Sequence, residues 1–319
     1  MYSNTQYWVL IGLILTILFV SFFHQPSAAA YSHMHPSYNS SEPDQQFPFG
    51  GMSFHASGWM QVFQGGVAKY IQEKYQLDKC KMVGTSGGAI VACTLCCDIP
   101  MDLAFSEILG VRNINKHNNV FRMCEDTKQV IKKMLPINCI ELMKNRLTIV
   151  CSKIENANIV TLYASAFNSY DDVLNYLNAT VHIPIFDGFF PQVTDAHNLY
   201  DGMLTDSHSP VLDPCLKVTW DSKCYCGCTQ ENNAIFPEIE IPHYWCMYPP
   251  DERILELLYY HGYYVAQKYF LSQTREEDKT NSEKVLVELC NEIHRQRHNN
   301  LIIQGSLFFA VCMGSAYMI

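Results

Sequence analysis

The spacing of hydrophobic positions from residue 52 onward predicts strands that alternate with helices. A short apolar run over 52–54 predicts a strand, and apolar side chains then recur at helical spacing over 59–75, which indicates a helix with one buried face. The short stretch "KCKMV" over 79–83 predicts another strand, and after a Gly-Ser turn we expect a helix over 88–97. This order predicts parallel strands joined by crossover connections.

The mixed pattern continues beyond residue 100. Residues 101–146 have the periodicity of helices, and the β-rich stretches 146–154 and 157–165 predict a pair of adjacent strands. We also expect a short helix over 170–180, a strand end that runs into a turn over 198–210, and one more strand over 217–223. Two C-terminal helices are expected over 249–270 and 282–294. The expected fold class is therefore α/β, with a mostly parallel central sheet flanked by helices.

Both ends of the chain are apolar and differ from the middle. The runs over 7–23 and 301–319 are each about long enough to cross a bilayer as a helix, which takes roughly 20 residues. We interpret the first run as a retained anchor. A cleaved secretory signal is the alternative, because the small residues at 26–30 resemble a cleavage region. The last run is interpreted as a second candidate anchor, with a core helix as its alternative.

These patterns divide the chain into five expected parts. They are an apolar signal or anchor segment, a linker, a catalytic domain, a Cys-containing loop with C-terminal helices packed on that domain, and an apolar tail. Their ranges are 1–25, 26–46, 47–220, 221–298 and 299–319.

Composition narrows the classes of partner. The chain has 319 residues, of which 48% are hydrophobic, so it can bury a substantial core. Its net charge of −9 argues against a nucleic-acid partner, because neutralising phosphates requires a basic surface.

The 14 cysteines include a tight cluster at Cys224, Cys226 and Cys228. Structural zinc uses ligand pairs two to four residues apart, and this run is too short to surround a tetrahedral ion by itself. A metal site would need further ligands such as Cys215 and Cys246. We interpret the segment instead as a disulfide or free-thiol loop and predict no metal site.

The turn at 84–88, "GTSGG", is the strongest chemical signal. Ser86 lies between glycines, after an apolar strand and before an apolar helix, as in the strained turn that exposes a nucleophilic serine. Gly84 and Gly88 have no side chain where strand and helix must approach. The amide of Gly87 begins the helix, where it could stabilise an oxyanion. The alternative is that Ser86 is only a small polar residue that starts a buried helix.

Five segments in the same order resemble the patatin-like phospholipase family, and within it the adipose triglyceride lipase and adiponutrin branch. The likeness covers about residues 47–270. "VGTSGGA" is similar to the nucleophile turn of that branch, and "RLTIVCSKI" and "VHIPIF" fall where the branch has strands. The other segments are "MSFHASGWMQVFQGGV", "YDGMLTD" and "MYPPDERILELLYYHGY". Their shared order is more specific than any one of them.

This resemblance implies a three-layer α/β fold and a lipid acyl hydrolase with a serine–aspartate dyad. Ser86 would attack an ester carbonyl and Asp201, which precedes Gly202, would accept its proton. No metal or organic cofactor is implied. The oxyanion would be bound by backbone amides at Gly87 and in a loop formed by Ala56, Ser57 and Gly58.

The implied substrates are lipid esters, with acylglycerols first and phospholipids second. The implied partner is a membrane or lipid-droplet surface, and the expected location is the endoplasmic reticulum or a lipid droplet. A secreted protein is the alternative, because Asn39 and Asn178 lie in glycosylation acceptor patterns that matter only in a lumenal or secreted chain.

Two departures from the family pattern bear on activity. The glycine-rich loop keeps only its middle glycine, Gly58, because Ala56 and Gln61 stand at the other two positions. Ala56 is tolerated only if its backbone φ is negative. Met203 stands where the family has a glycine. These changes favour the alternative of a weakly active or inactive lipid-binding or scaffold protein. An acyltransferase is a second alternative, because it shares the acyl-enzyme.

A Ser-Asp-His triad is a further alternative to the dyad. His208, His243 and His261 all follow Asp201 in the chain. His261 lies in the middle of an expected helix and is better interpreted as a packed, hydrogen-bonded core residue. His208 follows Asp201 in the turn and is the least implausible third member.

Overall fold

The computed structural model describes residues 45–115, 120–156, 158–184, 187–188, 190–194, 197–205, 215–222, 233–271 and 278–296. The chain divides into two compact units, one formed by Glu42–Cys290 and the other by Met1–Ser41 with Asn291–Ile319. In the second unit the described residues are 291–296, which are helical. The first unit contains the sheet and all predicted site residues.

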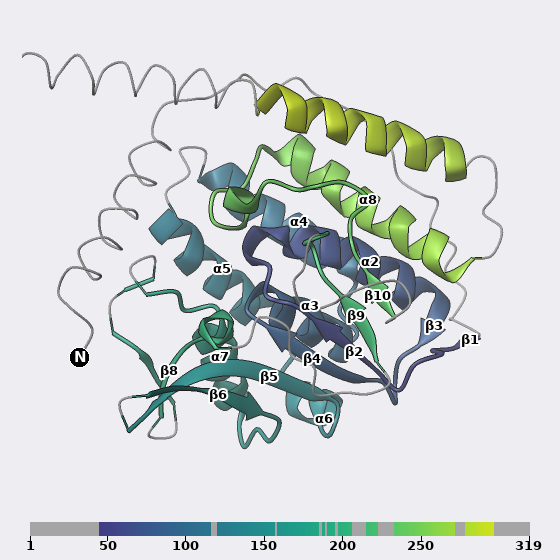
Figure 1. Cartoon of the computed structure of the whole chain (residues 1–319). Coiled ribbons are helices and arrows are strands. Elements are labelled where there is room, and N and C mark those ends of the chain that lie inside the picture. Colours follow the sequence, from purple (N-terminus) through teal and green to yellow (C-terminus); the bar gives the residue numbers. More distant parts are fainter. Residues whose placement is uncertain are drawn as a thin grey trace, which may run out of the picture. The chain divides into compact units, whose positions relative to one another are not determined.

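An eight-stranded sheet runs through the unit Glu42–Cys290 (Figure 1). Its order is β10-β9-β2-β4-β5-β8-β7, with β6 paired to β5. Neighbours are parallel from β10 to β5, and β5, β6, β7 and β8 pair antiparallel. The bounds are β2 Gly51–Phe54, β4 Lys81–Thr85, β5 Leu147–Glu155, β6 Asn158–Ala164, β7 Gln192–Thr194, β8 His197–Asp201, β9 Leu216–Val218 and β10 Ala234–Ile235. Strands β1 (Gln45–Gln46) and β3 (Tyr75–Gln76) form a separate parallel pair.

Helices flank this sheet, as the sequence predicts. They are α2 Gln61–Lys74, α3 Gly87–Cys96, α4 Met101–Ile114, α5 Val120–Met134, α6 Cys139–Met143, α7 Tyr170–Thr180 and α8 Glu252–Phe270, followed by a helix over 278–296. Short 3₁₀ turns are η1 Gly58–Met60, η2 Gly202–Leu204 and η4 His243–Cys246. The α/β class with a central sheet flanked by helices is therefore confirmed.

The first four predicted elements correspond to β2, α2, β4 and α3, and β2 pairs parallel with β4. The predicted adjacent strands are β5 and β6. One strand prediction was wrong and another was right in place but too long. Residues 181–184 of "VHIPIF" form no strand, and the strand expected over 217–223 ends at Val218 because the chain turns there. The expected helical stretch 101–146 is divided into three helices.

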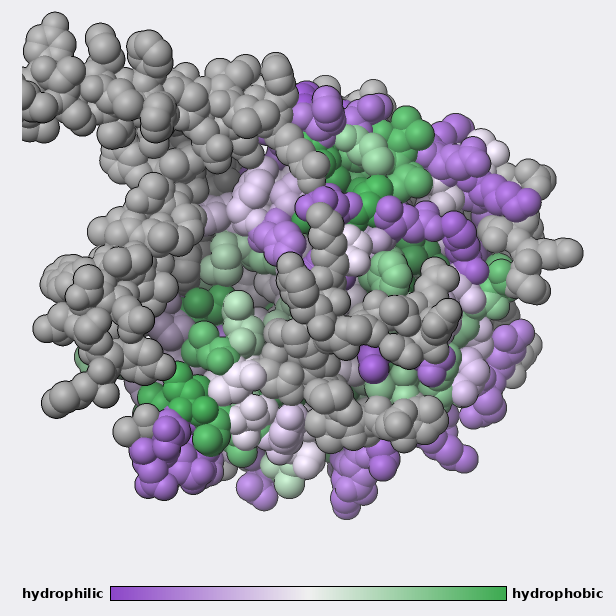
Figure 2. All heavy atoms as spheres, in the orientation of Figure 1, coloured by the Kyte–Doolittle hydropathy of each residue, from purple (hydrophilic) through white to green (hydrophobic). Residues whose placement is uncertain are grey.

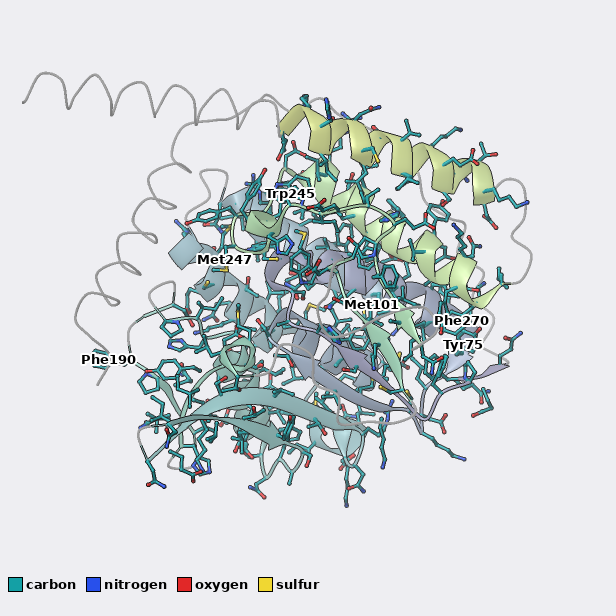
Figure 3. The ribbon with its side chains drawn as sticks, in the orientation of Figure 1. Tyr75, Met101, Phe190, Trp245, Met247 and Phe270 are labelled. Atoms are coloured by element: carbon teal, nitrogen blue, oxygen red, sulfur yellow. The ribbon has the colours of Figure 1, made fainter. Side chains whose placement is uncertain are left out.

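Glycines allow α2 and α8 to pack with their backbones in contact. A Cβ on Gly66 would lie 1.8 Å from the Tyr259 carbonyl oxygen, and one on Gly262 would lie 2.1 Å from that of Phe63. At the far end of α8, the ring of Phe270 packs on that of Tyr75 with centroids 5.0 Å apart (Figure 3). The apolar helical faces seen in the sequence thus meet each other rather than solvent.

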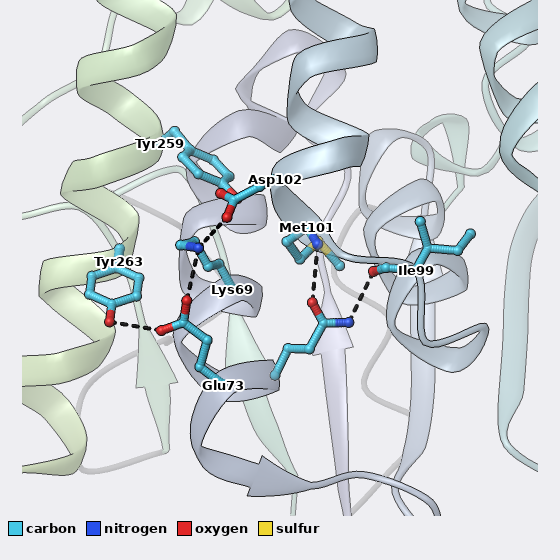
Figure 4. Close-up of polar contacts among 8 residues, drawn as sticks. Lys69, Glu73, Ile99, Met101, Asp102, Tyr259 and Tyr263 are labelled. Carbon is cyan, nitrogen blue, oxygen red and sulfur yellow. Dashed lines mark hydrogen bonds and ion pairs between the residues drawn. The ribbon is translucent and has the colours of Figure 1, made fainter. Parts of the chain in front are cut away.

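A cluster of polar side chains links α2 to α4 and α8; we call it the helix cluster (Figure 4). Lys69 on α2 forms ion pairs with Glu73 (2.8 Å) and with Asp102. The hydroxyls of Tyr259 and Tyr263 donate to Asp102 (3.1 Å) and Glu73 (2.9 Å). Burial lowers the pKa of Lys69, but its hydrogen bonds to the two carboxylates outweigh that effect and the pKa is raised. Lys69 is therefore held as a cation.

No helix within the described part of the chain is long and apolar enough to cross a membrane. The apolar runs over 7–23 and 301–319, on which the anchor predictions rest, lie outside the described residues.

Candidate active site

Ser86 lies on a strained turn between β4 and α3. Its backbone has φ 54° and ψ −130°, a conformation that non-glycine residues rarely adopt. Such strained conformations occur mainly at functional sites. A Cβ on Gly84 would lie 2.4 Å from Ala89 Cα, and one on Gly88 would lie 2.4 Å from the His55 carbonyl oxygen. The two glycines are therefore required for the close approach of strand, helix and neighbouring loop.

Strand β5 brings two distant parts of the chain together at this turn. β4 pairs with β5 as far as Thr85, opposite Val150, and β8 pairs with the next residue, Cys151, through Asp201. Because β6 pairs with β5 over 149–155, the ends of β4 and β8 both lie along the opposite edge of β5. The residue after β4 and the last residue of β8 are thus placed side by side.

Ser86 and Asp201 meet at this junction. The Ser86 hydroxyl donates a 2.7 Å hydrogen bond to Asp201 Oδ2, and the Met203 amide donates to Oδ1 at 2.9 Å. Asp201 is 0% exposed and Ser86 is 3% exposed. Burial raises the pKa of Asp201 to about 7, although the Met203 amide, the Ser86 hydroxyl and the field of His182 each act to lower it. The carboxyl group is therefore a much stronger base than an exposed aspartate.

Thr180, at the end of α7, braces the turn and was missed from sequence. Its hydroxyl accepts a hydrogen bond from the Ser86 amide at 2.9 Å and donates one to the Val150 carbonyl at 2.5 Å. In the sequence Thr180 is visible only as the third residue of the Asn178 acceptor pattern. That pattern does not indicate that its side chain is fully buried at the site.

The predicted oxyanion loop lies against the start of α3. A Cβ on Gly87 would lie 2.7 Å from Ser57 Oγ and 3.1 Å from the Gly58 amide nitrogen. Ser57 donates to Gln64 Oε1 at 3.0 Å, and Gln64 in turn donates to the His55 carbonyl at 2.9 Å. Gln64, a second residue missed from sequence, therefore fixes the loop beside Gly87.

The surviving glycine of the loop occupies the position that needs one. Gly58 has φ +50°, and a Cβ there would lie 2.2 Å from the Cys246 carbonyl oxygen. Ala56 does not have positive φ, and its carbonyl accepts a hydrogen bond from Trp220 Nε1 at 2.8 Å. The replacement of glycine by Ala56 is thus compatible with the backbone.

Gly202 also occupies a tight position. A Cβ there would lie 2.4 Å from the Val150 carbonyl oxygen and 2.8 Å from Thr85 Cγ2. Met203, by contrast, has a side chain that is 48% exposed, and only its amide contacts Asp201. The departure at Met203 therefore leaves the geometry around the carboxylate unchanged.

The histidines of the triad alternative do not contact the dyad in the described structure. His261 is buried in α8, where its Nε2 accepts the Glu238 amide at 3.3 Å and burial lowers its pKa to about 4. His243 Nε2 lies 3.9 Å from Asp221 Oδ1, and the His243 ring packs against that of Trp220. His208 lies outside the described residues. Instead, His182, which sequence reasoning missed, accepts the Asp201 amide on its backbone carbonyl at 2.9 Å.

Described cysteines and acidic or histidine side chains form no group that could hold a metal ion. Cys246 is a free thiol and Cys215 is buried, and the Cys224, Cys226 and Cys228 cluster lies outside the described residues.

Two apolar cavities border α3 beyond the turn. Both are lined by Ile90, Thr94, Ala104 and Ile108; Tyr259 also lines the first and Leu177 the second. Ile90 is one helical turn beyond Ser86, so apolar space begins close to the turn.

Comparison with known proteins confirms the resemblance to patatin-like phospholipase-domain proteins, at modest identity. No family model matches the chain. An omega-hydroxyceramide transacylase of Mus musculus is 21% identical over 246 residues, which is 68% of this chain and 40% of that protein. A 1-acylglycerol-3-phosphate O-acyltransferase of Mus musculus is 24% identical, over 53% of this chain and 42% of that protein. Patatin-like phospholipase domain-containing protein 2 of Bos taurus is 24% identical, over 49% of this chain and 34% of that protein.

Among solved structures, VipD from Legionella pneumophila has a TM-score of 0.42 and 9% identity, and covers 69% of this chain and 66% of its own. The ExoU–SpcU complex from Pseudomonas aeruginosa has a TM-score of 0.37 and 10% identity, covering 92% and 72%. The chain spans less than half the length of the curated relatives named above.

Proposed function

We propose that this chain, a relative of the patatin-like phospholipases, is an enzyme that cleaves carboxylic ester bonds of lipids through an acyl-enzyme on Ser86. The observation that carries the proposal is the 2.7 Å hydrogen bond from Ser86, on its strained turn, to the buried carboxylate of Asp201. A serine hydroxyl is a weak nucleophile unless a base within hydrogen-bond reach takes its proton. Asp201 is such a base, and it needs no histidine.

In the proposed mechanism, Ser86 Oγ attacks the ester carbonyl carbon while its proton passes to Asp201 Oδ2. The carbonyl oxygen gains negative charge, and the amides of Gly87 and Gly58 are the donors that would stabilise it; one such donor is worth about 3–4 kcal/mol in the transition state. The C–O bond of the ester then breaks, and the leaving alcohol takes the proton from Asp201. Water attacks the acyl-enzyme by the same steps in reverse and releases the fatty acid.

Apolar surroundings support a lipid as substrate. The two small cavities along α3 are apolar, and Ile90, which lines both, lies one helical turn beyond Ser86. Near the site, Phe190 and Met203 expose 85% and 48% of their surface. Figure 2 shows hydrophobic surface on the drawn face in the region of β8, and Phe190 is labelled at that side in Figure 3. We propose acylglycerols as the first substrate class and phospholipids as the second, taken from a membrane or lipid-droplet surface.

Acyl transfer is the second candidate activity. Two of the relatives are named for the transfer of acyl groups to alcohols. The acyl-enzyme is common to both reactions, and the outcome depends on whether water or a bound alcohol attacks it. Supplying purified enzyme with acylglycerol and a second alcohol, then analysing free fatty acid and new ester, distinguishes the two.

Labelling with a fluorophosphonate probe tests the proposal directly. The probe forms a covalent bond only with an activated serine, so we expect labelling at Ser86 and loss of both labelling and ester hydrolysis in Ser86→Ala. Ser106→Ala is the matched control, because Ser106 is exposed and its hydroxyl donates to the Leu103 carbonyl within its own helix. Continued ester hydrolysis by a folded Ser86→Ala protein would refute the proposal. If the probe does not label Ser86 in the wild-type chain, the lipid-binding or scaffold alternative is favoured.

A further inference from the structure

His182 lies directly beside the proposed base. It follows α7, and its backbone carbonyl accepts the Asp201 amide at 2.9 Å. Its side chain is buried, with the ring packed over that of Tyr200 at a centroid distance of 5.8 Å. The residue therefore joins the end of β8 to the segment that follows α7.

Both ring nitrogens of His182 face groups that accept hydrogen bonds. Nδ1 lies 2.7 Å from Asp187 Oδ2, and Nε2 lies 2.8 Å from the Phe190 carbonyl oxygen. A carbonyl can only accept, and so can an ionised carboxylate. A neutral imidazole has one donor and one acceptor nitrogen, so it cannot satisfy both contacts; the imidazolium can.

Asp187 is held ionised at this position. Its carboxylate pairs with Lys128 on α5 as well as with His182. Burial acts to raise the pKa of Asp187, but the hydrogen bonds from His182 and Lys128 outweigh it and hold the pKa below its usual value. Lys128 already balances the charge of Asp187, which leaves the charge of His182 to act on its other neighbours.

We propose that His182 is a positioning residue of the site, held as an imidazolium between Asp187 and the Phe190 carbonyl, which sets the base strength of Asp201. The inference rests on the proposed role of Asp201 as the base. In a site this dry, a carboxylate with no nearby cation would stay protonated at neutral pH and could not accept the proton of Ser86. The positive charge of His182 offsets part of that effect, so that Asp201 titrates within the working range.

The other titratable groups around His182 do not supply this charge. Asp187 and Lys128 balance each other, and Tyr200 is a phenol in ring contact. Cys124 on α5 is close enough to feel Asp187, Lys128 and Asp201, but burial raises the pKa of its thiol to about 12 and it stays neutral. In the described part of the site, His182 is therefore the cation whose field reaches Asp201.

The pH dependence of kcat/KM in the full chain separates this role from a merely structural one. His182→Gln removes the positive charge but keeps a polar amide, so the acid-side midpoint should move to higher pH by about one unit. With that shift, kcat/KM of His182→Gln should be about tenfold below wild type at pH 6 and less than about threefold below it at pH 9. His261→Gln, which alters an equally buried histidine in α8, should leave the midpoint unchanged. A uniform loss of rate at every pH in His182→Gln would overturn the inference.

The charge state itself can be read without any enzyme assay. In protein labelled with ¹⁵N-histidine, we expect one ring with both nitrogens protonated at pH 7.5 in wild type and in Ser86→Ala, and its absence in His182→Gln. A neutral ring at that position contradicts the inference even if ester hydrolysis is confirmed. Conversely, a protonated ring in a chain with no hydrolysis and no probe labelling leaves the charge established but refutes its role in setting a base.

Discussion

Two polar clusters in the same unit treat their carboxylates in opposite ways. In the helix cluster, Glu73 and Asp102 receive the ammonium of Lys69 and the hydroxyls of two tyrosines. At the site, the described residues that bond to the Asp201 side chain are Met203, through its amide, and Ser86, through its hydroxyl, and both are neutral donors. Glu73 and Asp102 share the positive charge of Lys69, whereas Asp201 is buried and its bonded partners carry no charge.

The difference follows from what each cluster has to do. A buried cation and its carboxylate partners neutralise one another, so removing one partner between α2, α4 and α8 destabilises the packing, and the raised pKa of Lys69 keeps its proton in place. A carboxylate buried among neutral donors costs free energy when ionised, and that same cost makes it take up a proton readily. The helix cluster therefore serves stability, and the Asp201 environment gives up stability for base strength.

Asp201→Asn is expected to have the largest effect. Asparagine can still accept the Met203 amide, but it cannot take the Ser86 proton, so ester hydrolysis should fall by about 10³-fold, within the range for loss of a general base. The measurement is kcat/KM on an acylglycerol at pH 8, with circular dichroism to show that the fold is kept. Activity within tenfold of wild type would mean that another group takes the proton.

Asp201→Asn should be more stable than the wild type at the pH values where the buried Asp201 carboxylate is ionised. The pKa of Asp201 is about 7 when folded, against about 3.9 in an unfolded chain. Because the folded pKa is raised, the folded wild type loses stability as pH rises from about 4 to about 7, and the loss is then constant; it amounts to roughly 3–4 kcal/mol. Denaturant unfolding should show Asp201→Asn similar to wild type at pH 4 and more stable at pH 8. A wild type that is relatively more stable at pH 8 would contradict the burial argument.

Lys69→Met tests the other half of the comparison. Removing the cation leaves Glu73 and Asp102 facing each other, and we expect the free energy of unfolding to fall by about 2–3 kcal/mol, less than for a fully buried pair because Asp102 is partly exposed. Activity per folded molecule should stay within about twofold. Lys133→Met is the control, because Lys133 pairs with Glu107 on the surface and its loss should cost less than about 1 kcal/mol. Equal effects of the two variants would show that the helix cluster is not a stabilising centre.

Local patterns in the sequence were sufficient to predict the β2–α2–β4–α3 order. Helical spacing predicts α2, and glycines on either side of Ser86 mark the strained turn. The single buried face expected for α2 is wrong, because every residue over 61–71 is buried. The short strands beyond β8 could not be bounded, because three-residue strands such as β9 carry too few positions for a period to appear. The loop over 181–184 was expected as a strand because the family resemblance places one there, yet in the structure these residues form no strand.

The meeting of Ser86 and Asp201 came from a family resemblance, since no local pattern links residues 115 positions apart. Their contact depends on the register of β5, in which Val150 and Cys151 face the ends of two different strands. Thr180 and His182 were missed for the same reason. Each acts through a contact with a distant strand end, and neither residue type is unusual where it stands in the sequence.

Met203 gives the smallest expected effect, and it separates the backbone of the site from its side chains. If Asp201 depends only on the amide of residue 203, then Met203→Ala should change kcat/KM by less than about threefold, and Met203→Gly should add only the cost of a more flexible turn, about 1 kcal/mol in stability. A soluble short-chain ester is the right substrate for this measurement, because the exposed Met203 side chain could also contact a lipid surface. A tenfold gain for Met203→Gly would show that the departure from the family glycine limits the chemistry, and that the side chain at position 203 affects Asp201 as well as its amide.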